Sequence, residues 1–484
     1  MVLFLTYNSN RHKIFSEHIF FHDIFRGMTR FISGLLFLTI AALPYITMFT
    51  SEERVQEDTS LPEEKIFIMS PHRREVRLEY SRGFSEWMKK NYKRRVKIEW
   101  LDAGGTSKML KDLESRYTNS PEKPGVDLLF GGGITPYLTA IEKNWLLPVE
   151  INPELLKYIP PDVAGVPVYD AKKRWFGVAL SGFGILYNRI LIERMGLPVP
   201  QTWEDLGKPE FFTWLASGDP RSSGSVHMCY EIILQAYGFE KGWDLITRIS
   251  GNVRVFSESG SSTPREVAIG EVAAGMAIDQ YAQTVIDAAG GDALIFVLPQ
   301  KATVIGADAI ALLRGSANQE ISSLFIEYCL SKEGQKLLFL PAGVEGQKNS
   351  LFRMPVRSDL YSERYAPPVN PYKIEAGFIY DDIKGGKRWN IINDMIGAWL
   401  IDAHSELSAA WGKIISIMDK YPDLAKKLKS ELSYLPISES DMEALIPQWN
   451  EPRIRLNKIN EWAREARNRY KRIISKIQTG DNHI

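Results

Sequence analysis

The sequence predicts an α/β fold in two units, followed by an all-helical C-terminal extension. Short apolar runs rich in β-branched residues alternate with amphipathic helical patterns over 65–148, and the same alternation returns over 211–339. From about Arg388 the strand pattern stops, and helical segments rich in Lys, Arg and Glu continue to the end. The alternation indicates a largely parallel sheet in each α/β unit.

The elements of the first unit follow from their residue patterns. Residues 65–70 (KIFIMS) are a short apolar run typical of a buried strand, and 95–102 (RVKIEWLD) alternate as a strand does. Residues 74–92 repeat their apolar side chains near helical spacing. The same reasoning predicts a loop and helix over 104–117, a strand and glycine loop over 126–133, and a helix over 135–148.

The second unit repeats this style. A strand ends within 211–220, and 222–249 reads as one helical segment. The remaining patterns predict a strand and loop over 253–262, a helix over 263–271, a strand and loop over 273–281, a short helix over 284–291, strands over 293–299 and 306–315, and a helix over 318–339.

The N-terminus carries an export signal. Residues 31–49 (FISGLLFLTIAALPYITMF) contain no charged residue, and as a helix they would span about 28 Å, close to the hydrocarbon thickness of a bilayer. Arg26 and Arg30 precede this run and two glutamates follow it, so the positive-inside rule places the rest of the chain outside the cytoplasm. An uncleaved anchor, a cleaved signal peptide and a start at Met28 all stay open. We expect a periplasmic or extracytoplasmic protein, anchored to the inner membrane by 31–49 on the anchor interpretation.

Composition excludes one class of partner. Lys plus Arg and Asp plus Glu number 59 each, and the zero net charge argues against a dedicated nucleic-acid-binding protein. The basic segments 89–95 and 453–476 read as solvated or amphipathic surfaces, with contact to an anionic membrane as the alternative for the second. Cys229 and Cys329 lie in apolar helical contexts, which predicts two buried free thiols.

Polar, glycine-rich loops follow the predicted strands. The stretch GDPRSSGS (218–225) offers more hydroxyl groups than a helix cap needs. In open α/β sheets ligands bind outside the carboxyl ends of strands, where glycine admits a ligand to the backbone and helix N-termini favour anions. We expect one shared polar pocket, although each loop alone could be a capped helix or a tight turn. The candidate ligand-binding residues are Ser70, His72, Gly105, Thr106, Ser107, Gly132, Gly133, Ser181, Arg221, Ser222, Ser223, Gly224, Ser259, Gly260, Ser261, Asp279 and Tyr281.

The sequence does not show the motifs expected of an enzyme or of a metal site. The sequence contains no G-x-x-x-x-G-K-[ST], H-E-x-x-H or G-x-S-x-G motif, so we expect neither catalysis nor a cofactor. Asp279 and Tyr281 could offer oxygen ligands to a hard cation, but two oxygens do not make a metal site, and we expect none. His227 and His404 read as structural residues of helices.

The order of these strands, loops and helices along the chain resembles that in the bacterial extracellular solute-binding proteins of ABC importers, in particular in their ferric-iron-binding-like branch. The similar stretches run collinearly from about residue 65 to 360: EWLDAGGTSKMLKDLE, VDLLFGGG, GVALSGFGILYNR, LPVPQTWEDL, SGDPRSSGS, EKGWDLI, SESGSSTPREVAIGEVAAGMAID, GADAIALLRGSANQE and YCLSKEGQKLLF. The resemblance implies a type II periplasmic-binding fold, with the ligand held between two lobes that close about a hinge. Its implied boundaries are 1–50 for the signal or anchor, 51–64 for a linker, 63–188 plus 306–372 for lobe 1, 189–305 for lobe 2, and 373–484 for the helical extension.

The resemblance also implies a function. A monomer would capture a small anionic solute, with a phosphorylated or phosphonate compound favoured, and would deliver it to an ABC permease in the inner membrane. Iron-binding members carry adjacent tyrosines after the strand that here reads AAGMAID, whereas this chain has QYAQ with Tyr281 alone. Ferric iron is therefore the alternative ligand. A membrane-anchored ligand sensor and an exported enzyme on the same fold are the alternative functions.

Overall fold

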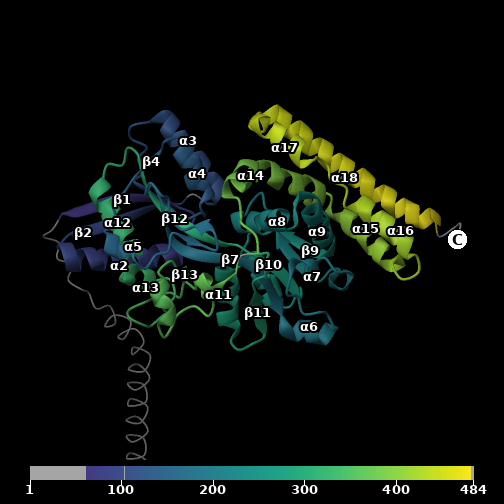
Figure 1. The fold of residues 1–484 in the computed structure, drawn as a ribbon, viewed down its shortest axis with the longest axis horizontal. Helices are drawn as coiled ribbons and strands as arrows, with labels where there is room; N and C mark the ends of the chain where they lie inside the picture. The colour runs from purple at the N-terminus through teal and green to yellow at the C-terminus, as the bar shows by residue number, and fades with distance from the viewer. Residues whose placement is uncertain (1–61, 103, 376, 481–484) are drawn as a thin grey trace, which may run out of the picture. The chain divides into compact units, whose positions relative to one another are not determined.

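The sheet begins with three strands near the N-terminal end of the folded unit. In the computed structural model, which describes residues 62–102, 104–375 and 377–480, β1 (Glu63–Ser70) pairs in parallel with β2 (Arg95–Asp102) and with β3 (Leu128–Phe130). Ile66 and Ile68 of β1 are fully buried. The helices α2 (Arg74–Tyr92) and α12 (Gln319–Leu330) pack against each other beside these strands (Figure 1). Both strands expected from the patterns at 65–70 and 95–102 are thereby confirmed.

Two long strands join the halves of the sheet. β7 (Phe176–Asn188) pairs with β12 (Ile305–Leu313) through its first half and with β10 (Ala274–Ile278) through its second half, and both pairings are antiparallel. The sheet order is β2-β1-β3-β12-β7-β10-β8-β9. The expectation of a largely parallel sheet is wrong at this centre, because a chain that crosses out along β7 and returns along β12 must run in opposite directions.

The second half of the sheet is parallel again away from that centre. β8 (Leu215–Gly218) lies between β10 and β9 (Val253–Ser257) and pairs in parallel with both, while β11 (Leu294–Val297) pairs with the end of β7. The helices of this half are α8 (Gly224–Tyr237), α9 (Phe239–Asn252), α10 (Ser262–Ala268) and α11 (Asp279–Ala289). The remaining elements of the α/β part are α3 (Thr106–Asn119), α4 (Thr135–Glu142), β4 (Leu146–Leu147), α5 (Pro153–Leu156), β5 (Asp162–Val163), β6 (Val166–Pro167), α6 (Arg189–Met195), α7 (Trp203–Leu206), η1 (Pro209–Phe211), α13 (Lys332–Lys336), β13 (Met354–Pro355), η2 (Ser358–Ser362) and η3 (Pro371–Lys373).

Three segments expected to be continuous helices are interrupted, and the first of them, 135–148, ends as α4 at Glu142 before the strand β4 at Leu146–Leu147. The segment 222–249 divides into α8 and α9 at Gly238, whose φ of 80° lies in the left-handed region that glycine adopts without strain. The segment 318–339 divides into α12 and α13 at Ser331, whose hydroxyl accepts a hydrogen bond from the N–H of Gly334 and so caps the new helix.

The C-terminal helices build part of a core. They are α14 (Asp382–Ile396), a π turn η4 (Gly397–Ile401), α15 (His404–Ile417), α16 (Pro422–Leu432), α17 (Glu439–Leu445), η5 (Ile446–Gln448) and α18 (Pro452–Gly480). The predicted helical extension is therefore present (Figure 1). It is not an appendage, because its buried Trp399, Trp411 and Trp462 share one hydrophobic core with Trp243 of α9.

A separate core belongs to the other half of the sheet. Its buried apolar residues come from 66–180 and 305–356, whereas the core that includes the C-terminal helices draws mainly on 183–304 and 380–477. The buried pair Arg388–Glu231 joins α14 to α8 inside the second core, with 2.7 Å between Nη2 and Oε1 and both side chains almost fully buried. A buried pair of this kind fixes the relative position of the two helices.

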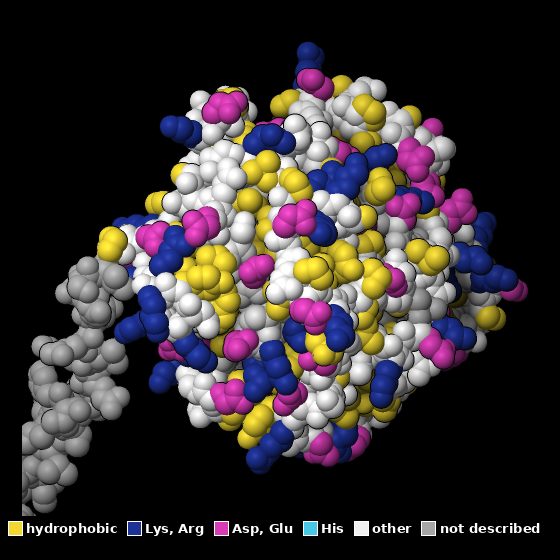
Figure 2. All heavy atoms as spheres, turned by 60° about the vertical axis from the view of Figure 1, so that its left-hand side comes forward, with side chains coloured by type: hydrophobic (Ala, Val, Ile, Leu, Met, Phe, Trp, Pro, Cys, Tyr) yellow, Lys and Arg dark blue, Asp and Glu magenta, His cyan; other side chains and the backbone are white. Residues whose placement is uncertain are grey.

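The other sequence predictions can be placed on this fold. Cys229 and Cys329 are buried free thiols, as expected. Both helical histidines have structural partners: His227 Nδ1 lies 2.6 Å from Asn393 Oδ1, and His404 Nε2 lies 2.9 Å from the carbonyl oxygen of Val253. On the face shown in Figure 2, basic and acidic side chains are interspersed rather than gathered into patches of one sign.

The predicted anchor falls outside the described residues. The chain divides at Pro62, and the described elements belong to the unit Glu63–Ile484. Among the helices of that described part, none combines the length and the apolar character that a membrane span requires. Residues 31–49, and the linker up to residue 61, lie beyond the part of the chain that the structure describes.

Candidate ligand-binding site

A cavity of about 400 Å³ lies where helices from both halves of the sheet begin. Its wall contains residues from the strand-end loops at 71–73, 104–106, 132–135, 222–225, 258–260 and 278–281, and from the crossing strands β7 and β12. The predicted residues that line it are His72, Gly105, Thr106, Gly132, Gly133, Ser181, Ser222, Ser223, Gly224, Ser259, Gly260 and Tyr281. The structure thus brings loops that are far apart in the sequence to one cavity.

Five predicted residues do not line this cavity. Ser70 and Ser261 lie behind it, hydrogen-bonded to the wall residues His72 and Ser259 respectively. Asp279 is buried, and it accepts a hydrogen bond of 2.7 Å from the N–H of Gln280. Ser107 lies on α3, and its side chain is outside the described part of the structure.

Arg221 is the fifth, and its surroundings differ from the expectation. Its guanidinium donates to the carboxylates of Asp219, at 2.7 Å, and Asp402, at 2.9 Å. Two carboxylates neutralise a cation that was expected to meet an anionic ligand. The structure instead gives Arg221 the role of joining the loop before α8 to the C-terminal helices.

Helix N-termini dominate the cavity wall. The helices α2, α3, α4, α8 and α11 begin at or next to lining residues, and none of the five has a hydrogen bond from its N-cap side chain; in α11 the N–H of Gln280 instead bonds the carboxyl group of Asp279. The first N–H groups of a helix have no partner within the helix, and the helix dipole adds a partial positive charge there. The cavity therefore offers helix N–H donors within the positive end of the helix dipoles, which favours an anion, and its wall also carries the carboxyl groups of Glu258 and Asp382.

A cation that the sequence analysis did not name adds to this field. Arg73 precedes α2 and lines the cavity, and its guanidinium lies 5.5 Å from the ring centroid of Tyr281 on α11. Within the described residues it forms no ion pair. Because no carboxylate neutralises it, its charge is available to a ligand. Its position directly after His72 was the signal that could have identified it.

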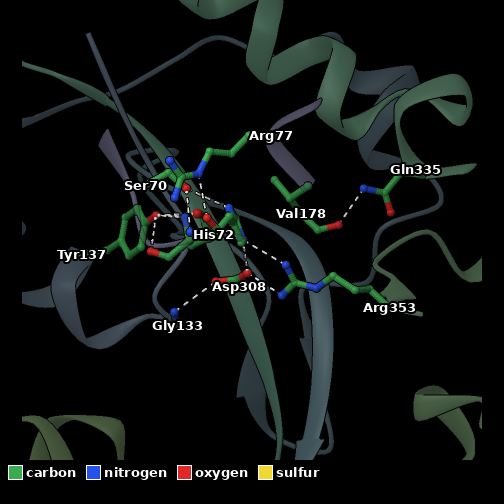
Figure 3. A network of polar contacts seen from close by, with 11 residues as sticks. Ser70, His72, Arg77, Gly133, Tyr137, Val178, Asp308, Gln335 and Arg353 are labelled. Carbon is green, nitrogen blue, oxygen red and sulfur yellow. Dashed lines mark hydrogen bonds and ion pairs between the residues drawn. The ribbon is translucent and has the colours of Figure 1, made fainter. Parts of the chain in front are cut away.

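A buried polar network supports the same wall (Figure 3). Asp308 of β12 lies between His72 and Arg353: its carboxylate is 2.7 Å from His72 Nε2 and forms an ion pair with Arg353 Nη2. The same carboxylate accepts a hydrogen bond of 3.1 Å from the N–H of Gly133. On the other side of the ring, His72 Nδ1 is 3.0 Å from Ser70 Oγ. One carboxylate thereby positions two of the cavity loops.

The protonation states in this network follow from its geometry. Burial lowers the pKa of His72 despite the neighbouring carboxylate of Asp308, so the ring is neutral at neutral pH. His72 Nε2 lies within hydrogen-bond distance of both Asp308 and Nη1 of Arg353, the latter at 2.9 Å, and in the tautomer that donates from Nε2 to Asp308 the Nδ1 atom accepts from the Ser70 hydroxyl. Burial would raise the pKa of Asp308, but the charge of Arg353 and the hydrogen bond from His72 outweigh it and hold that pKa well below its usual range.

Glycine is required at position 131, where the loop after β3 contacts this network. Gly131 has a φ of 97°, and a Cβ atom there would lie 2.6 Å from Cε1 of His72. Any other residue would be strained in its backbone and would displace the imidazole ring. The glycine loop after β3 therefore packs directly on His72, which holds the N–H groups of this loop at the cavity.

Two carboxyl groups near the cavity are hard to ionise. Burial raises the pKa of Asp279 to about 7. Burial, followed by repulsion from Asp381, raises the pKa of Asp382 to about 7 as well, and Asp382 lines the cavity from the first turn of α14. Among the residues that the structure describes, no group of three His, Cys, Asp or Glu side chains is arranged to hold a metal ion.

Sequence comparison matches part of the chain to a family. Residues 127–348 match the model described as "Bacterial extracellular solute-binding protein". Among curated proteins, the chain is 25% identical over 291 residues to "Phosphoglycerate transport regulatory protein PgtC" of Salmonella typhimurium, an alignment that covers 59% of this chain and 69% of that protein. The resemblance inferred from the sequence is confirmed at this level.

Comparison of folds agrees. The periplasmic binding protein AfuA from Actinobacillus pleuropneumoniae, with exogenous fructose-6-phosphate bound, is similar with a TM-score of 0.56 and 20% identity, covering 69% of this chain and 98% of that one. Iron-bound HitA from Pseudomonas aeruginosa is similar with a TM-score of 0.55 and 16% identity, covering 69% of this chain and 99% of that one. At these identities the comparison establishes the periplasmic-binding fold.

The family also bears on location. The matched family is described as extracellular, in agreement with the periplasmic or extracytoplasmic location expected for this chain, while anchoring by 31–49 stays a prediction. Family match, fold and cavity agree with one another. Residues 127–348 carry the match to the bacterial extracellular solute-binding protein family, and the described part of the chain has the fold of the periplasmic binding proteins.

Proposed function

We propose that the chain captures a small phosphorylated or phosphonate anion in the cavity and delivers it to an ABC permease in the inner membrane. The observation that carries this proposal is the meeting of five helix N-termini with Arg73, a cation without a carboxylate partner among the described residues. Phosphate oxygens accept several N–H bonds at once and pair with a guanidinium. The names of the relatives support the choice, since PgtC is named for phosphoglycerate transport and the AfuA structure contains fructose-6-phosphate.

The same residues argue against ferric iron, the alternative ligand. HitA is described as iron-bound, but it is similar to this chain in fold only. Here Tyr281 is the one tyrosine in the QYAQ segment, and the guanidinium of Arg73 lies over its ring. A cation in that position repels a trivalent metal ion and favours an anion.

The two-lobe division stays part of the proposal. Lobe 1 would comprise 63–188 plus 306–372, and lobe 2 would comprise 189–305. The two hydrophobic cores support these boundaries, because one draws on 66–180 and 305–356 and the other takes its α/β residues mainly from 183–304. Closure would bend the chain near 182–188 and 298–312, and would bring the loops of both lobes onto the solute. The protein would act as a monomer, without a cofactor, catalysis or nucleic acid.

Substitution of Arg73 tests the anion site. We expect Arg73→Ala to weaken binding of 3-phosphoglycerate or fructose 6-phosphate by roughly 10- to 100-fold, because a charge-assisted hydrogen bond contributes about 1.5–3 kcal/mol. Titration calorimetry on the full-length protein measures this loss. Arg74→Ala is the matched control, since Arg74 is the adjacent, exposed arginine outside the cavity wall. Equal affinities for the wild type and Arg73→Ala would contradict the proposed site.

A ligand sensor is the second candidate. One observation favours it: the relative PgtC is named as a regulatory protein of transport. A sensor and a carrier would use the same cavity but different partners. Ligand-dependent cross-linking of the full-length protein in its native membrane distinguishes them, because a carrier is captured with a permease and a sensor with a signalling protein.

A further inference from the structure

The wall of the cavity includes a residue from outside the family-matched segment. Trp389 lies on α14, beyond the matched residues 127–348, and it lines the cavity together with Asp382. It is half-buried. Its ring stacks on the imidazole of His227, with 3.6 Å between centroids and 30° between planes. Because His227 covers one side of the indole, the remainder of the ring is left to form the cavity wall.

Trp389 lies close to the loops that the proposed function assigns to the anion. A Cβ atom built on Gly224, at the start of α8, would lie 3.5 Å from Trp389 Cη2 and 3.5 Å from Thr106 Oγ1 of α3. The indole therefore adjoins the place where the helix starts of the two halves approach each other. A solute bound to those N–H groups would contact the indole with its remaining atoms.

The position of Trp389 is fixed before any solute binds. The preceding residue, Arg388, is buried, and its guanidinium pairs with Glu231 of α8 at 2.7 Å and with Glu439 of α17 at 2.6 Å. Burial lowers the pKa of His227 to about 3, so the imidazole under the indole is neutral and stacks without bringing a charge to the cavity. A side chain held this way loses little conformational freedom on binding.

From this geometry we propose that Trp389 determines specificity, and that the solute is an organic phosphate or phosphonate whose carbon skeleton packs against the indole. This inference rests on the proposed function and narrows its substrate class. An aromatic face contributes by burying apolar surface, and a bare inorganic ion has none to offer. The cavity volume of about 400 Å³ also fits a small organic molecule.

Calorimetric titration of the full-length protein with 3-phosphoglycerate, fructose 6-phosphate and inorganic phosphate tests this inference. We expect the wild type to bind at least one organic phosphate more tightly than inorganic phosphate. Trp389→Ala should weaken the binding of the organic phosphate at least tenfold and change the affinity for inorganic phosphate by no more than about twofold. The variant would then no longer discriminate between organic and inorganic phosphate. Trp145→Ala is the matched control, because that half-buried tryptophan stacks on Tyr117 outside the cavity wall and should leave all affinities unchanged.

The outcomes separate the two proposals. An equal loss for organic and inorganic phosphate, or no loss for either, would overturn the role of Trp389 while leaving the anion site supported by Arg73→Ala. Failure of the wild type to bind any of the three compounds would overturn the proposed function and this inference with it. If Trp389→Ala does not fold, Trp389→Leu keeps an apolar side chain against His227, removes the aromatic face, and must show the same loss of discrimination.

Discussion

Asp308→Asn is expected to lower the free energy of unfolding by about 3–5 kcal/mol, the usual cost of removing one partner from a buried ion pair. The substitution leaves the guanidinium of Arg353 buried without its carboxylate, since Arg353 is 3% exposed and Asp308 is 8% exposed. It also weakens the acceptor for His72 Nε2 and for the N–H of Gly133. Urea denaturation at pH 7 measures the change in stability.

The matched control is a surface carboxylate. Glu114 pairs with Lys143 at 2.6 Å, but both side chains are about half exposed, at 56% and 42%. Exposed pairs contribute about 0–1 kcal/mol, so Glu114→Gln should have a small effect. If Asp308→Asn changed stability no more than Glu114→Gln does, the network would not hold the cavity wall. Loss of solute affinity should accompany the loss of stability, because the network positions the loops at 71–73 and 131–133.

Asp279→Asn is expected to stabilise the protein by an amount that grows as pH rises from about 4 to about 7 and is complete above about pH 7. Burial raises the pKa of the Asp279 carboxyl to about 7, whereas in an unfolded chain it is about 3.9. Between these values the folded state binds a proton that the unfolded state does not, so the free energy of unfolding falls as pH rises through the window from about 4 to about 7. A difference of about three pKa units corresponds to about 4 kcal/mol.

The amide that Asp279→Asn introduces does not ionise, and its oxygen can still accept the hydrogen bond from Gln280 N–H, which is 2.7 Å long in the wild type. The variant and the wild type should therefore have similar stability near pH 4 and differ by several kcal/mol near pH 9. Thermal or urea unfolding across this range is the measurement. Asp287→Asn, at an exposed position on the same helix, should show no such divergence. A difference that does not depend on pH would contradict the assignment.

Local patterns were sufficient where neighbours in the sequence decide the structure. β2 coincides with the alternating segment 95–102, and the loops that line the cavity were recognised from their own composition of glycine, serine and threonine. The breaks at Gly238 and Ser331 were missed although the residues that make them are local. A glycine or serine inside an apolar helical pattern is compatible with either continuity or a cap, and tertiary packing decides between them.

The features that the sequence analysis did not predict depend mainly on contacts between residues far apart in the chain. His72 and Asp308 are 236 residues apart, so nothing near either one shows that they form a pair. Arg221 has one partner that the sequence could have indicated, Asp219 two residues before it, and a second, Asp402, that lies 181 residues away. Trp389 belongs to a helix whose pattern resembles any packed helix, and only its approach to His227 and Gly224 reveals the cavity beside it.

The shared core of the C-terminal helices has a consequence for the order of folding during synthesis. The core around Ile66, Phe325 and Val356 has its last buried residue at Val356, so it can be completed while a long segment is still being made. The other core includes both Ile185 and Ile477, and it cannot be completed until Ile477 has been synthesised. The apolar surfaces that α8 and α9 contribute to this core therefore stay without their partners until α18 is available, and exposed apolar surface of this kind favours aggregation.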